Sequence, residues 1–333
     1  MTIMSALPVS PARRIRKAAV TLLLWLVVVP GLLWTIVRLG GWDRGPLVQL
    51  LSFTPYVAVW AWLPAIAALV TKRWTLGVVA LAAAVVLGAL VLPRALPGGR
   101  GPASGLPLHV MTSNMLFGTA DAAEIVRLVR ANDVAVLAVQ EFTPDGRTAL
   151  AAAGLGDLLP YSSLADEPGA PGSGVYSRYP LTATGNRRNI GGFQQAYATV
   201  QPPGAGPLAV ESAHPLAPAA LAMNRSWRRD LAAEPAADPA GTPRILLGDF
   251  NATLDHQPLR KLIATGYRAA ADAAGQGLLP TWPFFGPRIS RVPPVTIDHV
   301  LVDKRIGVRA VSVHRIPHTD HRAVIAELTV PAG

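Results

Sequence analysis

The chain has 333 residues, of which 51% are hydrophobic and 15% are charged, and its formal net charge is +10. Through residue 107, ten basic residues stand against one acid, which accounts for +9 of that charge. The rest of the chain is close to neutral, so the net charge does not indicate a large basic surface for nucleic acid. The absence of cysteine excludes disulfides and thiolate zinc sites.

Three long apolar segments in the first hundred residues contain no Lys, Arg, Asp or Glu: residues 18–37, 47–70 and 74–92. Each is long enough to cross a hydrocarbon core of about 30 Å as a helix. Proline occurs inside two of them, but it is tolerated in transmembrane helices. Residues 1–92 are therefore predicted to form a membrane domain with three transmembrane helices.

The basic residues around these segments predict an orientation. Arg13, Arg14, Arg16 and Lys17 precede the first segment, and the pair at 72–73 joins the second to the third. Because cytoplasmic loops collect Lys and Arg, the N-terminus is expected in the cytoplasm. Three crossings then place the remainder of the chain outside the cell, although the basic residues after the third segment weigh in the opposite direction.

The chain after the apolar segments is predicted to form one large catalytic domain, residues 108–333. Residues 93–107 are rich in Pro and Gly and predict a short linker. The order of apolar runs predicts an α/β fold, with two mixed sheets packed together and flanked by helices. Strands are expected at 108–113, 134–139, 174–177, 196–201, 208–212, 245–247, 300–302 and 323–326, and helices at 122–130, 219–233 and 258–264.

Four polar motifs lie beside these expected strands, at 140–141, 248–251, 297–300 and 319–322. Mg²⁺ prefers oxygen ligands, so Glu141 is the first candidate metal ligand, with Asn114 and Asp320 completing or orienting its shell. Asp249 and Asn251 lie two residues apart in a tight turn, where both can reach one water. Asp249 would accept its proton, while Asn251 would hold the water or a phosphate oxygen.

Two histidines are candidate contacts to a phosphoryl group. His214 and His321 would stabilise charge on its nonbridging oxygens, and Asp298 would orient His321 by hydrogen bonding one ring nitrogen. Strand alternation should turn His299 to the other face. Which of Asp249 and the histidines moves the proton stays open. Packed or exposed positions are expected for His109, His256, His314 and His318, and Tyr176 and Arg178 either pack or lie near the phosphate.

Taken in chain order, these motifs resemble the endonuclease/exonuclease/phosphatase superfamily over about residues 108–330. The resemblance also includes the strand 174–180 and the turn 213–215. It implies a four-layered α/β sandwich that cleaves phosphodiester or phosphomonoester bonds with Mg²⁺, or with Mn²⁺ as an alternative ion. Substrates in that superfamily range over DNA, RNA, sphingolipids and inositol phosphates, so the resemblance alone does not select one.

An outward catalytic domain after three spans is similar to the VanJ-type branch, associated in actinobacteria with resistance to teicoplanin-type glycopeptides. This resemblance implies hydrolysis of undecaprenyl diphosphate to the monophosphate, which recycles the cell-wall lipid carrier, at a bacterial cell membrane. The expected partners are the lipid bilayer and a lipid-linked diphosphate; nucleic acid is less favoured, and no protein partner can be inferred. The alternatives are an extracellular nuclease, a phosphodiesterase acting on another phospholipid, or a non-catalytic sensor of lipid or antibiotic.

Overall fold

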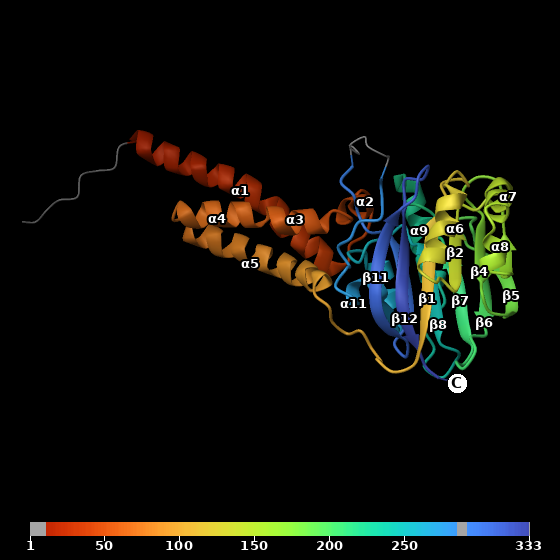
Figure 1. Ribbon diagram of the computed structural model, residues 1–333. Coiled ribbons are helices and arrows are strands. Elements are labelled where there is room, and N and C mark those ends of the chain that lie inside the picture. The colour runs from red at the N-terminus through yellow and green to blue at the C-terminus, as the bar shows by residue number, and fades with distance from the viewer. Residues whose placement is uncertain (1–10, 285–291, 333) are drawn as a thin grey trace, which may run out of the picture. The chain divides into compact units, whose positions relative to one another are not determined.

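A computed structural model describes residues 11–284 and 292–332 (Figure 1). The chain divides into two compact units. The first, here called the helical unit, contains the residues up to Trp42 together with Thr54–Val91. The second, here called the sheet unit, contains Asp43–Phe53 and the chain from Leu92 onward.

The helical unit consists of apolar helices. Two helical stretches of the chain, Pro11–Gly40 and Trp74–Ala95, are long and apolar enough to cross a membrane, and the second extends into the first residues of the sheet unit. Most large apolar side chains of the first stretch are exposed, as a lipid-facing helix requires. By length and composition these stretches support membrane association. The helices are α1 (Pro11–Gly40), α3 (Thr54–Trp60), α4 (Trp62–Val70) and α5 (Trp74–Val91).

The predicted second span, residues 47–70, does not form one helix, so the three transmembrane helices of the sequence prediction are not confirmed. Its first residues form α2 (Leu47–Leu51), which belongs to the sheet unit. The remainder, Thr54–Val70, is a shorter apolar helix that is interrupted at Ala61. Pro64 accounts for the interruption, because proline has no N–H to offer the carbonyl four residues earlier.

The sheet unit contains two six-stranded mixed sheets, each with one parallel pair at its centre. In both sheets the other neighbouring strands are antiparallel. The first sheet has the order β11 (Gly307–Arg315), β12 (Arg322–Val330), β1 (Leu106–Asn114), β2 (Val136–Gln140), β4 (Ser173–Ser177), β3 (Tyr161–Ala165). The second has the order β5 (Leu181–Arg188), β6 (Gln194–Val200), β7 (Leu208–Ala213), β8 (Arg244–Asp249), β10 (Asp298–Asp303), β9 (Tyr267–Ala269).

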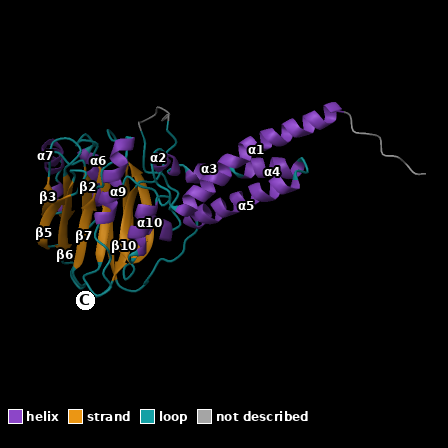
Figure 2. Cartoon of the chain, turned by 180° about the vertical axis from the view of Figure 1, so that it is seen from behind, coloured by secondary structure: helices purple, strands orange, loops and turns teal. Residues whose placement is uncertain are grey.

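The alternation of apolar residues along the strands builds the layers. Val110 and Ile245 belong to the core between the two sheets, whereas their neighbours Met111 and Leu246 pack on the two outer faces. One outer face is covered by α6 (Ala122–Ala131), α7 (Pro144–Ala152) and α8 (Leu155–Leu158), and the other by α9 (Asn224–Ala233) and α10 (Gln257–Ala264). Figure 2 shows α9 and α10 on that second face. The predicted α/β fold of two packed mixed sheets flanked by helices is confirmed.

Segment Asp43–Phe53 packs in the sheet unit, although the sequence prediction assigned it to the membrane domain. Val48 is fully buried in the cluster beneath α9 and α10, and its carbonyl accepts a 2.7 Å hydrogen bond from Nε2 of His256. Gln49 donates to the carbonyl of Pro218 (2.6 Å) and to the side chain of Asn224 (3.1 Å). The domain boundary predicted at residue 92 therefore omits a segment of the sheet unit.

The predicted linker, residues 93–107, is also held against the sheet unit. The guanidinium of Arg94 donates two hydrogen bonds of 2.7 Å to the carboxylate of Asp255, and both side chains are buried. Further along, the amide of Gly98 donates to the carbonyl of Ala273 (3.1 Å). The backbone carbonyl of Arg100 accepts from the amide of Val308 (2.7 Å). These contacts fix the segment at several points, so it is not a free tether.

Candidate active site

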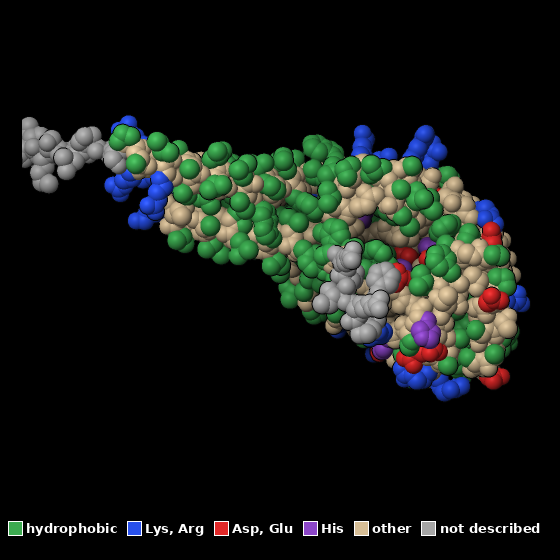
Figure 3. Space-filling model, turned by 90° about the horizontal axis from the view of Figure 1, so that it is seen from above, with side chains coloured by type: hydrophobic (Ala, Val, Ile, Leu, Met, Phe, Trp, Pro, Cys, Tyr) green, Lys and Arg blue, Asp and Glu red, His purple; other side chains and the backbone are tan. Residues whose placement is uncertain are grey.

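The candidate site lies at one edge of the two sheets, where both central parallel pairs end. Asn114 is the last residue of β1 and Glu141 follows β2. In the second sheet His214 follows β7 and Asp249 is the last residue of β8. Parallel neighbours end at the same edge, so each central pair contributes two polar side chains. Figure 3 shows a hollow in which acidic and histidine side chains are visible.

Two more motif residues reach this edge on antiparallel strands. Asp298 opens β10 and lies opposite Asp249 in the register of β8 and β10. His321 immediately precedes β12, which is antiparallel to β1. β10 and β12 run opposite to their central neighbours β8 and β1. Residues at the starts of β10 and β12 therefore meet residues at the ends of β1, β2, β7 and β8.

The backbone around the site has unusual local geometry. Glu141 and Asn251 have positive φ angles of 51° and 48°, a left-handed conformation that is uncommon outside glycine. Gly248 precedes Asp249 where β8 approaches β7 closely, since an added Cβ would lie 1.9 Å from the carbonyl oxygen of Ala213. The Gly-Asp-Phe-Asn motif therefore combines a close strand contact with a tight turn that aims its two polar side chains.

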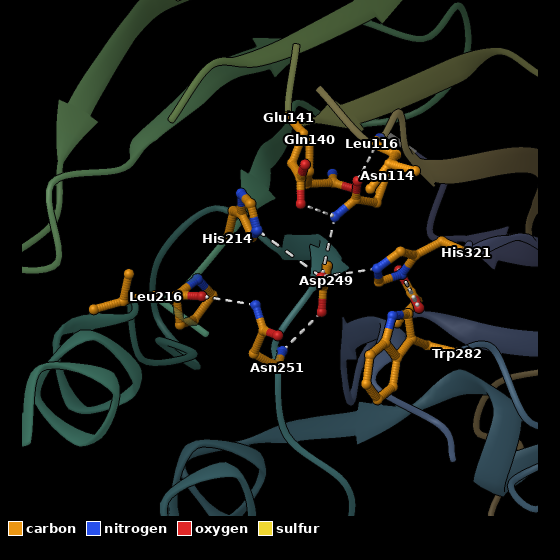
Figure 4. Close-up of polar contacts among 12 residues, drawn as sticks. Asn114, Leu116, Gln140, Glu141, His214, Leu216, Asp249, Asn251, Trp282 and His321 are labelled. Atoms are coloured by element: carbon orange, nitrogen blue, oxygen red, sulfur yellow. Dashed lines mark hydrogen bonds and ion pairs between the residues drawn. The ribbon is translucent and has the colours of Figure 1, made fainter. Parts of the chain in front are cut away.

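Asp249 occupies the centre of the site (Figure 4). One carboxylate oxygen accepts from the amide of Asn251 (2.8 Å), and the other accepts from the side chain of Asn114 (3.1 Å). The second oxygen also lies 3.7 Å from Nε2 of His321 and 3.9 Å from Nε2 of His214. Burial raises the pKa of Asp249 to about 7 even though His321 opposes the shift, so this carboxyl is suited to take up a proton near neutral pH.

The two site histidines differ in charge. Nδ1 of His321 lies 3.0 and 3.1 Å from the two carboxylate oxygens of Asp298. Burial alone would lower the pKa of His321, but the carboxylates of Asp298 and Asp249 raise it to about 10. Burial and the charge of His321 lower the pKa of His214 to about 3. Near neutral pH the site therefore holds one imidazolium and one neutral imidazole.

The predicted metal ligands lie beside this group. The side-chain amide of Asn114 donates to Glu141 (3.1 Å), whose other oxygen accepts from the amide of Phe117 (2.9 Å). Burial raises the pKa of Glu141, which shows that its negative charge is poorly solvated. One oxygen of Asp320 accepts from the indole of Trp282 (2.8 Å), and the other is buried without a hydrogen-bond partner among the described residues.

The acidic residues fit a divalent cation. Four carboxyl groups gather around one imidazolium, and the oxygen of Asp320 that lies 3.9 Å from Nε2 of His321 has no hydrogen-bond partner in the described part of the chain. Asp249, Asp298 and His321 form the closest group, with ligand atoms within 4.8 Å of one another. However, Nδ1 of His321 already hydrogen bonds to Asp298, so the geometry of this group is suited to proton and phosphate chemistry. Asn114, Glu141 and Asp320 as metal ligands stay a prediction.

The remaining histidines pack away from the centre, as predicted. Nε2 of His299 donates to the carbonyl of Ala252 (2.8 Å) on the other face of the strand. Arg178 forms an ion pair of 2.7 Å with Asp133, and Tyr176 packs edge-on against Phe142. Arg178 is therefore held by an ion pair and Tyr176 by packing. His109, His256 and His314 also hydrogen bond to neighbouring groups outside the centre, and His318 is exposed.

Sequence reasoning did not identify several residues that support the site. Gln140 donates to the hydroxyl of Ser212 (2.9 Å) and accepts from Thr112 (3.1 Å), which ties the two sheets together below Glu141. Trp282 orients Asp320, and its ring lies 6.4 Å from that of His321. The sequence offers one signal for the first network, namely three polar residues at buried strand positions. Trp282 lies in a loop and offers none.

The fold and the site together define a phosphoesterase-type α/β protein. A family model described as "Endonuclease/Exonuclease/phosphatase family" matches residues 111–321. The chain therefore belongs to this family, whose members hydrolyse phosphoester bonds and typically depend on a divalent metal. No curated protein matches the chain.

Solved structures share the fold at low sequence identity. An endonuclease/exonuclease/phosphatase from Beutenbergia cavernae DSM 12333 has 20% identity and a TM-score of 0.53, covering 68% of this chain and 72% of its own. A D. rerio TDP2 humanized by 14 mutations has 12% identity and a TM-score of 0.52, with coverages of 67% and 99%. A TDP2 from C. elegans has 14% identity and a TM-score of 0.52, with coverages of 68% and 76%. At these identities the likeness shows the fold alone.

Replacing Asp298 by asparagine should lower the upper pH limit of activity. Asp298 helps to keep the buried His321 protonated, so without its charge burial pulls the pKa of His321 down. We expect the midpoint of the basic limb of the kcat–pH profile to move to lower pH by about one pH unit or more. Asp303→Asn, at the other end of β10, should leave the limb in place. An unchanged profile in Asp298→Asn would show that protonated His321 is not required.

Proposed function

We propose that the protein is a membrane-anchored, metal-dependent phosphoesterase that acts outside the cytoplasm and hydrolyses undecaprenyl diphosphate to the monophosphate. In this reaction water attacks the terminal phosphorus, and the bond from that phosphorus to the bridging oxygen breaks. The products are inorganic phosphate and the lipid monophosphate. The observation that carries the proposal is a buried cluster of carboxyl, amide and imidazole groups in a unit to which the ends of apolar helices are covalently joined.

The site residues supply the groups that this hydrolysis needs. Asp249, with a pKa near 7, accepts the proton of the attacking water, and Asn251 helps to hold that water. His321 as an imidazolium, and His214 as a neutral donor, stabilise charge on the nonbridging oxygens. A divalent cation held by Asn114, Glu141 and Asp320 would add Lewis-acid stabilisation of the phosphoryl oxygens.

Exposed apolar side chains support a lipid substrate. Phe117 is 53% exposed, and its amide donates to Glu141. Ile190 is 59% exposed and follows Asn189, whose side chain donates to the carbonyl of His214 (3.0 Å). Large apolar side chains on segments that carry or contact site residues are suited to contact the chain of an amphiphile. The near-neutral charge after residue 107 counts against the alternative, a nuclease.

A parallel assay tests the substrate. The full chain in neutral detergent with Mg²⁺ is given undecaprenyl diphosphate, plasmid DNA, single-stranded DNA and a generic phosphodiester, and phosphate release or cleavage is followed. We expect the lipid diphosphate to be hydrolysed fastest, with loss of activity on adding chelator. Faster cleavage of either DNA would replace the lipid phosphatase proposal by the nuclease. Binding of the lipid without turnover of any substrate would favour the sensor.

The packing of Asp43–Phe53 supports the proposed topology. This segment follows α1 and precedes α3, yet it belongs to the same unit as the chain that follows α5. If α1 crosses the membrane once, Thr54–Val70 and α5 must together return the chain to the same side. The basic residues at 13–17 and 72–73 then lie on the opposite, cytoplasmic side.

A reporter fused after residue 333 tests this orientation. We expect a reporter that functions only outside the cytoplasm to be active there, because the proposed crossings place the sheet unit outside. The same reporter inserted at the 71–73 turn should be inactive. Activity of a cytoplasm-only reporter at the C-terminal position would overturn the orientation and remove the extracellular lipid from consideration.

A further inference from the structure

A second concave site lies on the sheet unit, and none of the motif residues lines it. It is a cavity of about 470 Å³ between segment Asp43–Phe53, α9 and α10. Three cationic side chains and several apolar ones line it, chiefly Arg44, Arg228, Leu231, Pro258, Lys261 and Leu262. A cavity with both cationic and apolar walls is suited to an anion that carries an apolar part.

The cations of this cavity carry charge that the protein does not neutralise. Within residues 11–284 and 292–332, Arg44, Arg228 and Lys261 form no ion pair or side-chain hydrogen bond. Among the described residues of the lining the single acid is Glu234, which is 5% exposed; one of its oxygens accepts a 2.7 Å hydrogen bond from Arg187, and the other has no hydrogen-bond partner among these residues. Three neighbouring cations without partners repel one another, and a bound anion would relieve that repulsion.

The cavity also has a defined place along the chain. Arg44 lies four residues after Gly40, the end of the apolar helix α1, and between them Trp42 is 55% exposed. Exposed Trp followed by Arg is typical of the membrane interface, where head groups lie. The side chain of Asp43 accepts a hydrogen bond from the amide of Gln257, the first residue of α10, which fixes Arg44 beside the helix that carries Lys261.

We propose that this cavity binds the phosphate-bearing head group of an anionic phospholipid of the surrounding membrane. The guanidinium groups of Arg44 and Arg228 and the ammonium of Lys261 contact the phosphate, and the accessible lining residues Ala232, Ala236 and Pro258 contact the first carbons of the lipid. The proposal rests on the membrane placement given under the proposed function but not on the identity of the substrate. A lipid held here would be a permanent neighbour of the sheet unit and not a reactant.

The test measures binding of short-chain lipids to the full chain in neutral detergent by calorimetry. The ligands are dihexanoyl phosphatidylglycerol, dihexanoyl phosphatidylcholine, glycerol phosphate and inorganic phosphate. We expect wild type to prefer the phosphatidylglycerol, and Arg44→Gln/Arg228→Gln/Lys261→Gln to weaken that binding by at least about tenfold. The charge-matched control Arg130→Gln/Arg225→Gln/Arg229→Gln changes exposed residues outside the cavity and should bind as wild type does.

Several results would overturn the proposal. Equal weakening in the control would show non-specific attraction, and equal affinity for inorganic phosphate would show a site for free anions. If the triple variant is less stable in a thermal melt, the single variants Arg228→Gln and Arg228→Lys replace it. The lysine variant should then bind the lipid more tightly than the glutamine variant. Equal binding by the two would count against a phosphate contact.

A parallel assay on a water-soluble phosphate ester separates the two proposals. The triple cavity variant should hydrolyse it at the wild-type rate, and a lower rate would mean that the cavity belongs to the catalytic machinery. If wild type fails to hydrolyse undecaprenyl diphosphate while cavity-dependent phosphatidylglycerol binding persists, the proposed substrate is wrong and the lipid site stands.

Discussion

Glu141→Gln should reduce metal-dependent turnover by at least about a hundredfold while leaving the fold intact. Glutamine keeps the size of the side chain and an oxygen that can accept from the amide of Phe117, but it removes the negative charge. Glu141 is one of four carboxyl groups around the site, and its buried charge is costly unless a cation compensates it. A titration of activity with Mg²⁺ should show a higher midpoint as well as a lower maximum.

Glu327→Gln is the matched control for this variant, because it is an exposed glutamate on β12 away from the site. It should retain wild-type activity and the wild-type Mg²⁺ midpoint. The two variants should also melt at similar temperatures. Near wild-type turnover in Glu141→Gln at limiting Mg²⁺ would contradict its role as a ligand.

His321→Ala should lower kcat by about a hundredfold or more, as expected when a charge stabiliser of the transition state is removed. The imidazolium lies 3.7 Å from Asp249 and is held by Asp298, so its loss changes both the phosphoryl contact and the charge balance of the site. Because the interaction strengthens as charge develops, KM should change much less than kcat.

His109→Gln provides the comparison, since His109 lies toward the other end of β1 and hydrogen bonds to the carbonyl of Asn132 (2.6 Å). It should leave kcat within about twofold of wild type, because substitutions away from functional features have small effects. An increase in KM with unchanged kcat for His321→Ala would assign His321 to substrate binding and not to the chemical step.

The strands that the sequence predicted are the interior strands of the two sheets. The four that it missed, β3, β5, β9 and β11, are the four edge strands. Interior strands are buried on both faces and read as continuous apolar runs, as in β2 and β8. β5 is exposed along most of its length and contains Gly and Arg, so it carries no such signal.

Residues 47–70 show that the length of an apolar run does not by itself identify a membrane span. Residues 47–70 contain no charge, yet the first five helical residues there belong to the sheet unit, and Val48 packs beneath α9 and α10. Apolar residues such as Val48 serve a protein core as well as a lipid, and only the partners, here His256 and Asn224, distinguish the two. His256 lies 208 residues from Val48, and Asn224 lies 175 residues from Gln49, so both are beyond the reach of local sequence patterns.

The meeting place of the candidate site residues could be predicted, because these residues occupy strand ends that the motifs mark directly. His214, Asp249, Asp298 and His321 meet as expected, and Asn114 bridges Asp249 and Glu141. The supporting residues Gln140 and Trp282 could not be predicted, because their roles depend on which strand or loop lies opposite.

The insertion of Asp43–Phe53 into the sheet unit sets an order of assembly. This segment leaves the ribosome long before His256, so during synthesis it stays without its partners until that later part of the chain is made. Final closure of that face of the unit is therefore a late, non-local event. For the same reason, a protease cut between α5 and β1 should leave the two pieces associated, because Asp43–Phe53 and the docked segment around Arg94 contact the sheet unit independently.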